Sequence, residues 1–93
     1  MGIMALMLTY VIYNKDTPAE RQSADLVDRL VAAQVDAELL DADSPRGIQL
    51  CENYDIMSRP AVALMRADGS PMQIWQGEDS LPSVSDVSYL VHQ

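Results

Sequence analysis

The first third of the chain shows two kinds of apolar pattern in succession. Leu6–Tyr13 is a nearly continuous run of β-prone residues with apolar side chains on both faces, which is typical of a central strand buried on both sides. Pro18–Gln34 then takes helical period, with apolar residues on one side and charged residues on the other. The apolar side consists of Leu26, Val27, Leu30 and Val31.

A second strand and a second helix follow. Val35–Asp41 carries Asp36 and Glu38 inside its apolar pattern, and such charges suit an edge strand that must resist pairing with other chains. Ser44-Pro45 is a helix start signal, because Ser favours the N-cap and Pro the first helical position. It predicts a helix over residues 45–54. The inner face of this helix is expected to include Ile48, Cys51 and Tyr54.

The last third predicts a hairpin and a closing helix. Ala61–Met65 and Met72–Trp75 are strands, and residues 67–70 form the turn between them. Ser83 caps the last helix. Its inward residues are expected to be Val84, Val87, Leu90 and Val91. The order β-α-β-α-β-β-α predicts an α/β fold with a parallel, right-handed first βαβ unit and an antiparallel hairpin, in one domain over residues 1–93.

Composition narrows the classes of function. The chain of 93 residues has 14 acidic and 6 basic residues and a net charge of −8, so a nucleic-acid backbone or an anionic membrane would repel it. Met1–Tyr13 is too short to span a bilayer, and it lacks the basic region and cleavage site of a signal peptide. The single cysteine argues against a disulfide-stapled secreted fold. We therefore expect a cytoplasmic protein with no nucleic-acid or membrane partner.

Several motifs from residue 41 onward resemble the thioredoxin/glutaredoxin family. Asp41-Ala42-Asp43 and the segment from Tyr54 to Pro60, which has the form Y-x-I-x-x-x-P, are followed by a strand, Asp68-Gly69 and Gly77. The resemblance covers roughly residues 6–92. It implies a thioredoxin-like fold with a four-stranded mixed sheet in the order 2-1-3-4, flanked by helices. It also implies that Pro60 is in the cis form beside the site.

The chain departs from the family where the first helix begins. Glutaredoxins carry a C-P-x-C motif there, and its chemistry needs one stabilised thiolate and a second, resolving thiol. Thr17 and Glu20 stand at the two cysteine positions, so no catalytic residue carries over. The pattern Thr17-Pro18-Ala19-Glu20 instead predicts a capping box, with Pro18 at the first helical position. A ligand contact through Thr17 is the alternative, since some glutathione transferases use a hydroxyl at a similar place.

The resemblance brings further residues to this vestigial site. Arg59 is expected to lie near Glu20 or Asp16, where it would balance the carboxylate at the helix end. The turn with Gly77, Asp79 and Ser80 resembles the place where glutaredoxins hold part of glutathione. A helix-entry turn explains these residues equally well.

The remaining residues with reactive, metal-binding or aromatic side chains are interpreted as structural. Cys51 is interpreted as a buried, inert thiol, with a reactive thiol as the alternative. The single histidine, His92, lies next to the end of the sequence and excludes multi-histidine metal sites, so no metal is expected. Asp41 and Asp43 favour a strand-end turn over a cation site, and Trp75 favours packing over a ligand platform.

Three hypotheses remain, and whether the chain is an enzyme stays open, with a non-enzyme favoured. The first is a redox-inactive thioredoxin-like module without a cofactor, which binds a protein or peptide partner in the groove beside the proline by β-augmentation. The second is a glutathione-binding or transferase-like protein that uses Thr17. The third is an oxidoreductase that acts through Cys51. All three agree that one cysteine cannot perform two-thiol chemistry alone.

Overall fold

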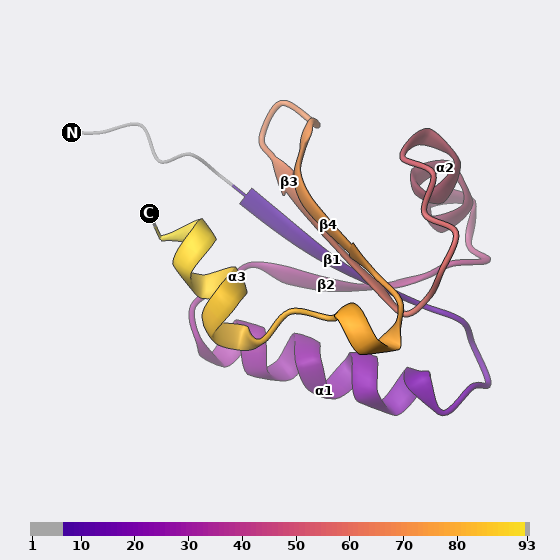
Figure 1. The fold of residues 1–93 in the computed structure, drawn as a ribbon, viewed down its shortest axis with the longest axis horizontal. Coiled ribbons are helices and arrows are strands. Elements are labelled where there is room, and N and C mark those ends of the chain that lie inside the picture. The colour runs from indigo at the N-terminus through magenta and orange to yellow at the C-terminus, as the bar shows by residue number, and fades with distance from the viewer. Residues whose placement is uncertain (1–6, 93) are drawn as a thin grey trace.

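The computed structural model describes residues 7–92, and its elements follow the expected order (Figure 1). They are β1 (Met7–Tyr13), α1 (Ala19–Ala32), β2 (Ala37–Asp41), α2 (Pro45–Asn53), β3 (Ala61–Arg66), β4 (Pro71–Gln76), the short 3₁₀ helix η1 (Glu78–Ser80) and α3 (Val84–Val91). The predicted strands and helices are thus present, with ends that differ by one or two residues. Leu6, the first residue of the predicted first strand, lies outside the described residues.

The four strands form one mixed sheet in the order β2-β1-β3-β4. β1 is parallel to β2 and antiparallel to β3, and β3 and β4 form the antiparallel hairpin. This confirms the fold class and the strand order that the resemblance implied. β2 is an edge strand, as the charges Asp36 and Glu38 predicted, and Glu38 is exposed.

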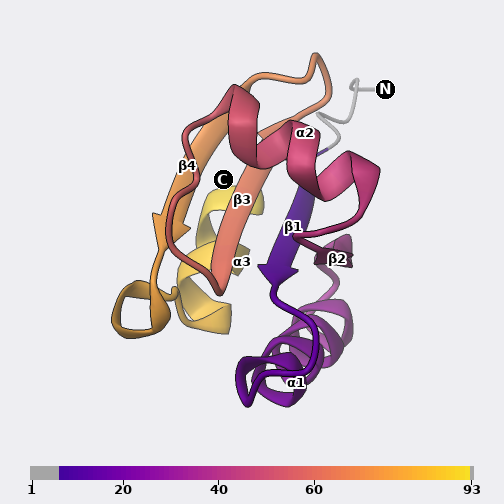
Figure 2. The ribbon, with the colours of Figure 1, turned by 90° about the vertical axis from the view of Figure 1, so that its right-hand side faces the viewer.

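The sheet buries a separate apolar cluster on each face, because successive side chains of a strand point to opposite sides. Val11 and Val62 belong to the cluster beneath α1 and α3, and Trp75 packs against the same cluster, as expected. Tyr10 and Ala63 belong to the cluster on the other face, against which residues of α2 pack. Figures 1 and 2 show this division, with α1 and α3 on one side of the sheet and α2 on the other.

α2 begins as predicted, and Cys51 and Tyr54 pack inward as predicted, but Ile48 does not. Ser44 is the N-cap, its hydroxyl accepts a hydrogen bond from the Gly47 amide, and Pro45 follows at the first helical position. Ile48 was expected to point inward and is 45% exposed. The reason is the buried Gly47, which brings the helix backbone against the chain at Asp41. The inward stripe therefore runs through positions 47, 50, 51 and 54 and leaves Ile48 outside.

Of the two helices on the opposite face, α3 has the predicted N-cap, and α1 has a narrower buried face than predicted. In α3, Ser83 and Asp86 form a reciprocal capping box. In α1, Leu26 and Leu30 are buried as predicted, whereas Val31 is 55% exposed at the edge of the stripe. None of the helices between residues 7 and 92 has the length and apolar character needed to cross a membrane.

Candidate functional site

Most of the predicted site residues lie at one end of the sheet. Ile12 pairs with Ala61 and Ala61 pairs with Gln76, so the end of β1, the start of β3 and the end of β4 lie side by side (Figure 2). Asn14 and Thr17 follow β1, Arg59 and Pro60 precede β3, and Gly77 follows β4. We call the surface formed by these five residues the proline surface.

The entrance to α1 differs from the predicted capping box. The N-cap position is occupied by Pro18, with helical backbone angles and no side-chain cap hydrogen bond. The Thr17 hydroxyl turns back and donates to the Asn14 carbonyl, at 2.6 Å. The Glu20 carboxylate accepts from the amide of Asp16, at 2.9 Å, instead of the amide of Thr17. The helix therefore starts one residue later than predicted. Pro18 occupies the N-cap position with helical backbone angles, and Thr17 belongs to the preceding turn.

Arg59 reaches across to the loop after β1, but not to a carboxylate. Its Nε donates to Asn14 Oδ1 at 2.8 Å, and its Nη1 donates to the Ile56 carbonyl at 3.2 Å. Among the described residues it forms no ion pair, so the expected balance with Glu20 or Asp16 is not found. The position before the proline does face the mouth of α1, as expected. The partner is the side-chain amide of Asn14, while the Glu20 carboxylate accepts from the Asp16 amide.

The backbone around Pro60 is held by Gln76, at the end of β4, and by Gly77, which follows it. The Arg59–Pro60 peptide bond is cis. The Pro60 carbonyl accepts from the Gly77 amide at 3.0 Å, and Gly77 has a φ of 93°, which a residue with a Cβ rarely adopts. Gln76 Oε1 accepts from the amides of Met57 and Ser58, at 2.8 and 3.3 Å.

Arg59 is the exception within this segment. Its side chain is tied down, yet its own backbone N–H and C=O have no hydrogen-bond partner among residues 7–92. Arg59 as a residue is exposed. Arg59 thus has an unpaired backbone donor and an unpaired backbone acceptor, while its neighbours Ser58 and Pro60 are held by hydrogen bonds.

Asp79 and Ser80 lie in η1, immediately after Gly77, and both are exposed. The Ser80 amide donates to the Gly77 carbonyl at 3.0 Å. Their backbone therefore forms a compact turn next to the proline surface.

Sequence reasoning missed two residues that organise this site. Asn14 accepts from both Thr17 and Arg59, through its carbonyl and its side chain, and Gln76 anchors the segment before Arg59. Both are uncharged amides at strand ends, a pattern that carries no signal until the strands are placed side by side.

The remaining candidates lie elsewhere. Cys51 is half-buried and packs against the apolar cluster under α2. Asp41 Oδ1 accepts from the Asp43 amide at 2.9 Å, which is a strand-end turn. His92 ends α3, and its ring lies within hydrogen-bonding distance of Ser88 and of the Gln34 carbonyl. Within the described residues, no group of three or more His, Cys, Asp or Glu side chains is arranged to hold a metal ion.

Comparison with known proteins identifies the fold. No family model and no curated protein matches the sequence. Among solved structures, thioredoxin-2 of a malaria parasite, described as a component of that parasite's protein secretion machinery, superposes with a TM-score of 0.65 at 16% identity over 99% of this chain and 86% of its own. A thioredoxin from Thermus thermophilus gives 0.60 at 14% identity over 95% and 72%.

A third structural neighbour is the N-terminal domain of SasA from Synechococcus elongatus, with a TM-score of 0.54 at 20% identity over 100% of this chain and 83% of that domain. At these identities the likeness concerns the fold. The chain has the thioredoxin fold.

Proposed function

We propose that this chain is a redox-inactive thioredoxin-like module, which binds an extended segment of a partner protein by backbone pairing at Arg59. The observation that carries the proposal is that the backbone N–H and C=O of Arg59, an exposed residue, have no hydrogen-bond partner among residues 7–92. An extended peptide satisfies both groups at once, as an added strand does at a sheet edge.

The neighbouring contacts favour such pairing because they fix the donor and the acceptor in advance. Gln76 holds the amides of Met57 and Ser58, and Gly77 holds the Pro60 carbonyl. The Arg59 side chain is bound to Asn14 and to the Ile56 carbonyl. A peptide therefore meets a backbone that loses little conformational freedom on binding.

One apolar contact is also offered next to the pairing site. Met57 is 80% exposed and lies two residues before Arg59. Methionine adapts its shape to different apolar side chains, so it suits a surface that accepts more than one peptide sequence. Thiol chemistry adds nothing at this surface, since Thr17 and Glu20 occupy the positions of the family's cysteines.

Glutathione is the second ligand considered at the same surface. The Thr17 hydroxyl retains acceptor capacity while it donates to Asn14, and the turn with Gly77, Asp79 and Ser80 lies next to it. However, Asp79 and the adjacent Glu78 repel an anionic tripeptide. We therefore favour a peptide partner over glutathione.

The test combines peptide selection with amide hydrogen exchange on the full chain. A displayed library of random dodecapeptides is selected against the protein, and the enriched peptide is then added to ¹⁵N-labelled protein. We expect slower exchange at the Arg59 amide. The control amide is that of Leu39, which the parallel register also leaves unpaired at the edge of the sheet.

Two matched variants sharpen the result. Gln76→Ala removes the acceptor that holds the Met57 and Ser58 amides, and we expect it to weaken peptide binding by about tenfold, the equivalent of about one lost hydrogen bond. Gln73→Ala, at an exposed position of the same strand, should leave the affinity unchanged. Failure to enrich any peptide, or protection of Leu39 without Arg59, contradicts the proposal. Glutathione binding that shifts the Thr17 and Gly77 resonances and competes with the peptide favours the second ligand instead.

A further inference from the structure

The four methionines between residues 7 and 92 differ widely in how far solvent reaches the side chain. Met65 in β3 is buried, and Met7 in β1 and Met72 in β4 are half-buried. Met57 is 80% exposed, which makes it the most exposed of the large apolar side chains in the described part of the chain. Met57 is therefore the described methionine that a dissolved reagent reaches most easily.

The backbone on either side keeps Met57 at the surface. The preceding residue, Ile56, is 2% exposed and belongs to the apolar cluster against which α2 packs. Its amide donates to the Cys51 carbonyl at 2.9 Å, and the Met57 amide donates to Gln76 Oε1 at 2.8 Å. With Ile56 held inside and its own amide held by Gln76, Met57 presents its thioether to solvent.

An exposed thioether reacts with peroxides by oxygen transfer. A lone pair of the sulfur attacks one peroxide oxygen, and the S–O bond forms as the O–O bond breaks. The hydroxide that leaves takes the proton of the transferred oxygen and becomes water, so the sulfur is oxidised by two electrons and the peroxide is reduced. The product is methionine sulfoxide, which is polar, and methionine sulfoxide reductases return it to the thioether at the expense of two thiols.

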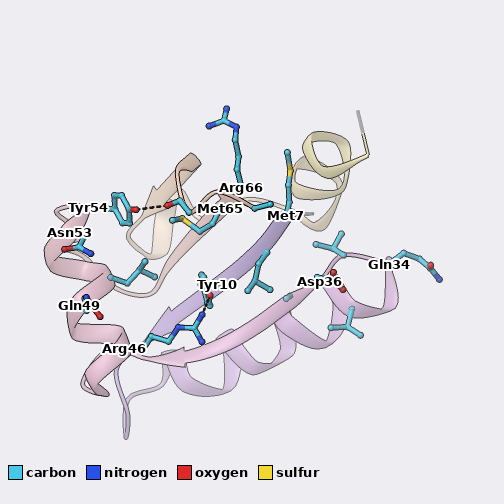
Figure 3. Close-up of a pocket in the computed structure, with 17 residues that line it drawn as sticks. Met7, Tyr10, Gln34, Asp36, Arg46, Gln49, Asn53, Tyr54, Met65 and Arg66 are labelled. Atoms are coloured by element: carbon cyan, nitrogen blue, oxygen red, sulfur yellow. Dashed lines mark hydrogen bonds between the residues drawn. The ribbon is translucent and has the colours of Figure 1, made fainter. Parts of the chain in front are cut away.

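Met7 and Met65 lie away from the proline surface. Both line a groove of about 920 Å³ beside α2, in which Figure 3 labels them. Met7 pairs with Arg66, whereas the proline surface lies next to the pairing of Ile12 with Ala61, at the opposite end of the same strands. An oxygen added to either of these two sulfurs thus changes the groove and leaves the proline surface as it is.

An oxygen added to Met57 lies beside the backbone that is proposed to pair with a peptide. Met57 precedes Arg59 by two residues, and Gln76 holds the amides of Met57 and Ser58 together. A peptide side chain that packs on the thioether meets the dipole of a sulfoxide after oxidation. Burying this dipole without a hydrogen-bond partner costs free energy, so the oxidised protein holds the peptide less tightly.

We propose that Met57 is a reversible oxidation site for peroxides, and that its oxidation weakens the binding of a peptide at Arg59. The chain then responds to oxidants although Thr17 and Glu20 stand at the positions of the family's cysteines. The effect on binding rests on the function proposed above, whereas the oxidation of Met57 is independent of it.

Peptide mapping by mass spectrometry tests the oxidation itself. The full chain is treated with hydrogen peroxide at neutral pH, and the sulfoxide at each methionine is followed over time. We expect Met57 to react at least about fivefold faster than Met7, Met65 and Met72, because susceptibility follows the exposure of the sulfur. Oxidation of any of these three as fast as Met57 overturns the assigned site.

The effect on binding is measured with the peptide enriched by selection against the protein. Its affinity is compared before peroxide, after peroxide, and after repair by a methionine sulfoxide reductase with dithiothreitol. We expect oxidation to weaken binding by about tenfold and repair to restore it. Met57→Leu should bind the peptide equally before and after peroxide, because leucine has no sulfur. The matched control Met72→Leu, at a half-buried position of β4, should keep the tenfold response.

Three results contradict the switch in different ways. An affinity unchanged by complete oxidation of Met57 overturns the switch and leaves the pairing at Arg59 standing. A response that persists in Met57→Leu overturns it as well, because it assigns the effect to another sulfur, such as that of Cys51. Failure of the unoxidised protein to bind any peptide refutes the pairing at Arg59, and the switch falls with it.

Discussion

Gly47 offers a sharp test of how α2 is packed against the sheet. Replacing a helical glycine by alanine ordinarily stabilises a protein, because alanine restricts the unfolded chain and favours the helix, by about 0.5–1 kcal/mol. At Gly47 we expect the opposite sign. A Cβ built on this residue lies 2.0 Å from the Asp41 carbonyl oxygen and 3.0 Å from the Ala42 Cα.

The size of the effect follows from what must move. Real Cβ atoms almost never lie closer than 3.0 Å to another atom of this kind, so the contact between the Cβ and the Asp41 oxygen is about 1 Å too short. The opposing atoms are backbone, so no side-chain rotation relieves the contact. A shift of α2 by this amount also disturbs the bonds that the Ser44 hydroxyl and amide donate to the Asp41 carbonyl, at 2.6 and 3.0 Å. Overpacking costs about 1–3 kcal/mol and a lost hydrogen bond about 1 kcal/mol, so after the helix-propensity gain we expect a net loss of about 2 kcal/mol.

Urea unfolding of the full chain, followed by circular dichroism, measures this loss. The matched control is Gln49→Ala, at an exposed position of the same helix, which should change the free energy of unfolding by less than about 0.5 kcal/mol. A Gly47→Ala protein as stable as the parent, with an unchanged m-value, would refute the close approach of α2 to the end of β2.

Three further predictions test other parts of the structure. Ser83→Ala should lower the free energy of unfolding in urea by about 1 kcal/mol, because it removes a formed N-cap. Thr17→Ala should lower it by less than about 0.5 kcal/mol, because Thr17 caps no helix. A larger loss for Thr17→Ala contradicts the observed helix start. The Ser70 hydroxyl and amide donate to Asp68 and hold the pKa of that carboxyl below its ordinary value. Stability from this contact is therefore present at neutral pH and is lost as the pH falls through the lowered pKa, and Ser70→Ala should raise the Asp68 titration midpoint in NMR. Finally, an insulin-reduction assay should show no disulfide reduction above the rate of free thiols, and catalysis that survives Cys51→Ala would contradict redox inactivity.

Much of the fold can be predicted from local sequence patterns. The apolar run of β1, the helical period of α1 and the Ser44-Pro45 start of α2 each depend on neighbours within a few residues, so they are visible in one dimension. The edge position of β2 was likewise predicted by its own charges. These features persist because tertiary contacts reinforce the local preference instead of opposing it.

The candidate site depended on contacts that no local pattern contains. Asn14 meets Arg59 across 45 positions of sequence, and Gln76 reaches the amide of Met57 across 19. Charge complementarity had assigned Glu20 or Asp16 to Arg59, but the Glu20 carboxylate accepts from the amide of Asp16 within its own turn. A nearby backbone donor is held in place by the turn itself, whereas a pair between distant exposed charges must order two long side chains.

The exposed residues of the helices also separate what the sequence predicts from what the tertiary structure decides. Helical period determined that α1 and α2 are amphipathic, but the tertiary structure decided where the edge of each buried stripe falls. Ile48 turned outward because Gly47 lets the backbone of α2 approach Asp41, and Val31 stayed exposed at the edge of the apolar stripe of α1. The sequence by itself thus determined which segments fold into which elements. The distance and the angle at which those elements pack depend on the size of side chains far apart in sequence, and they decided which side chains remain exposed.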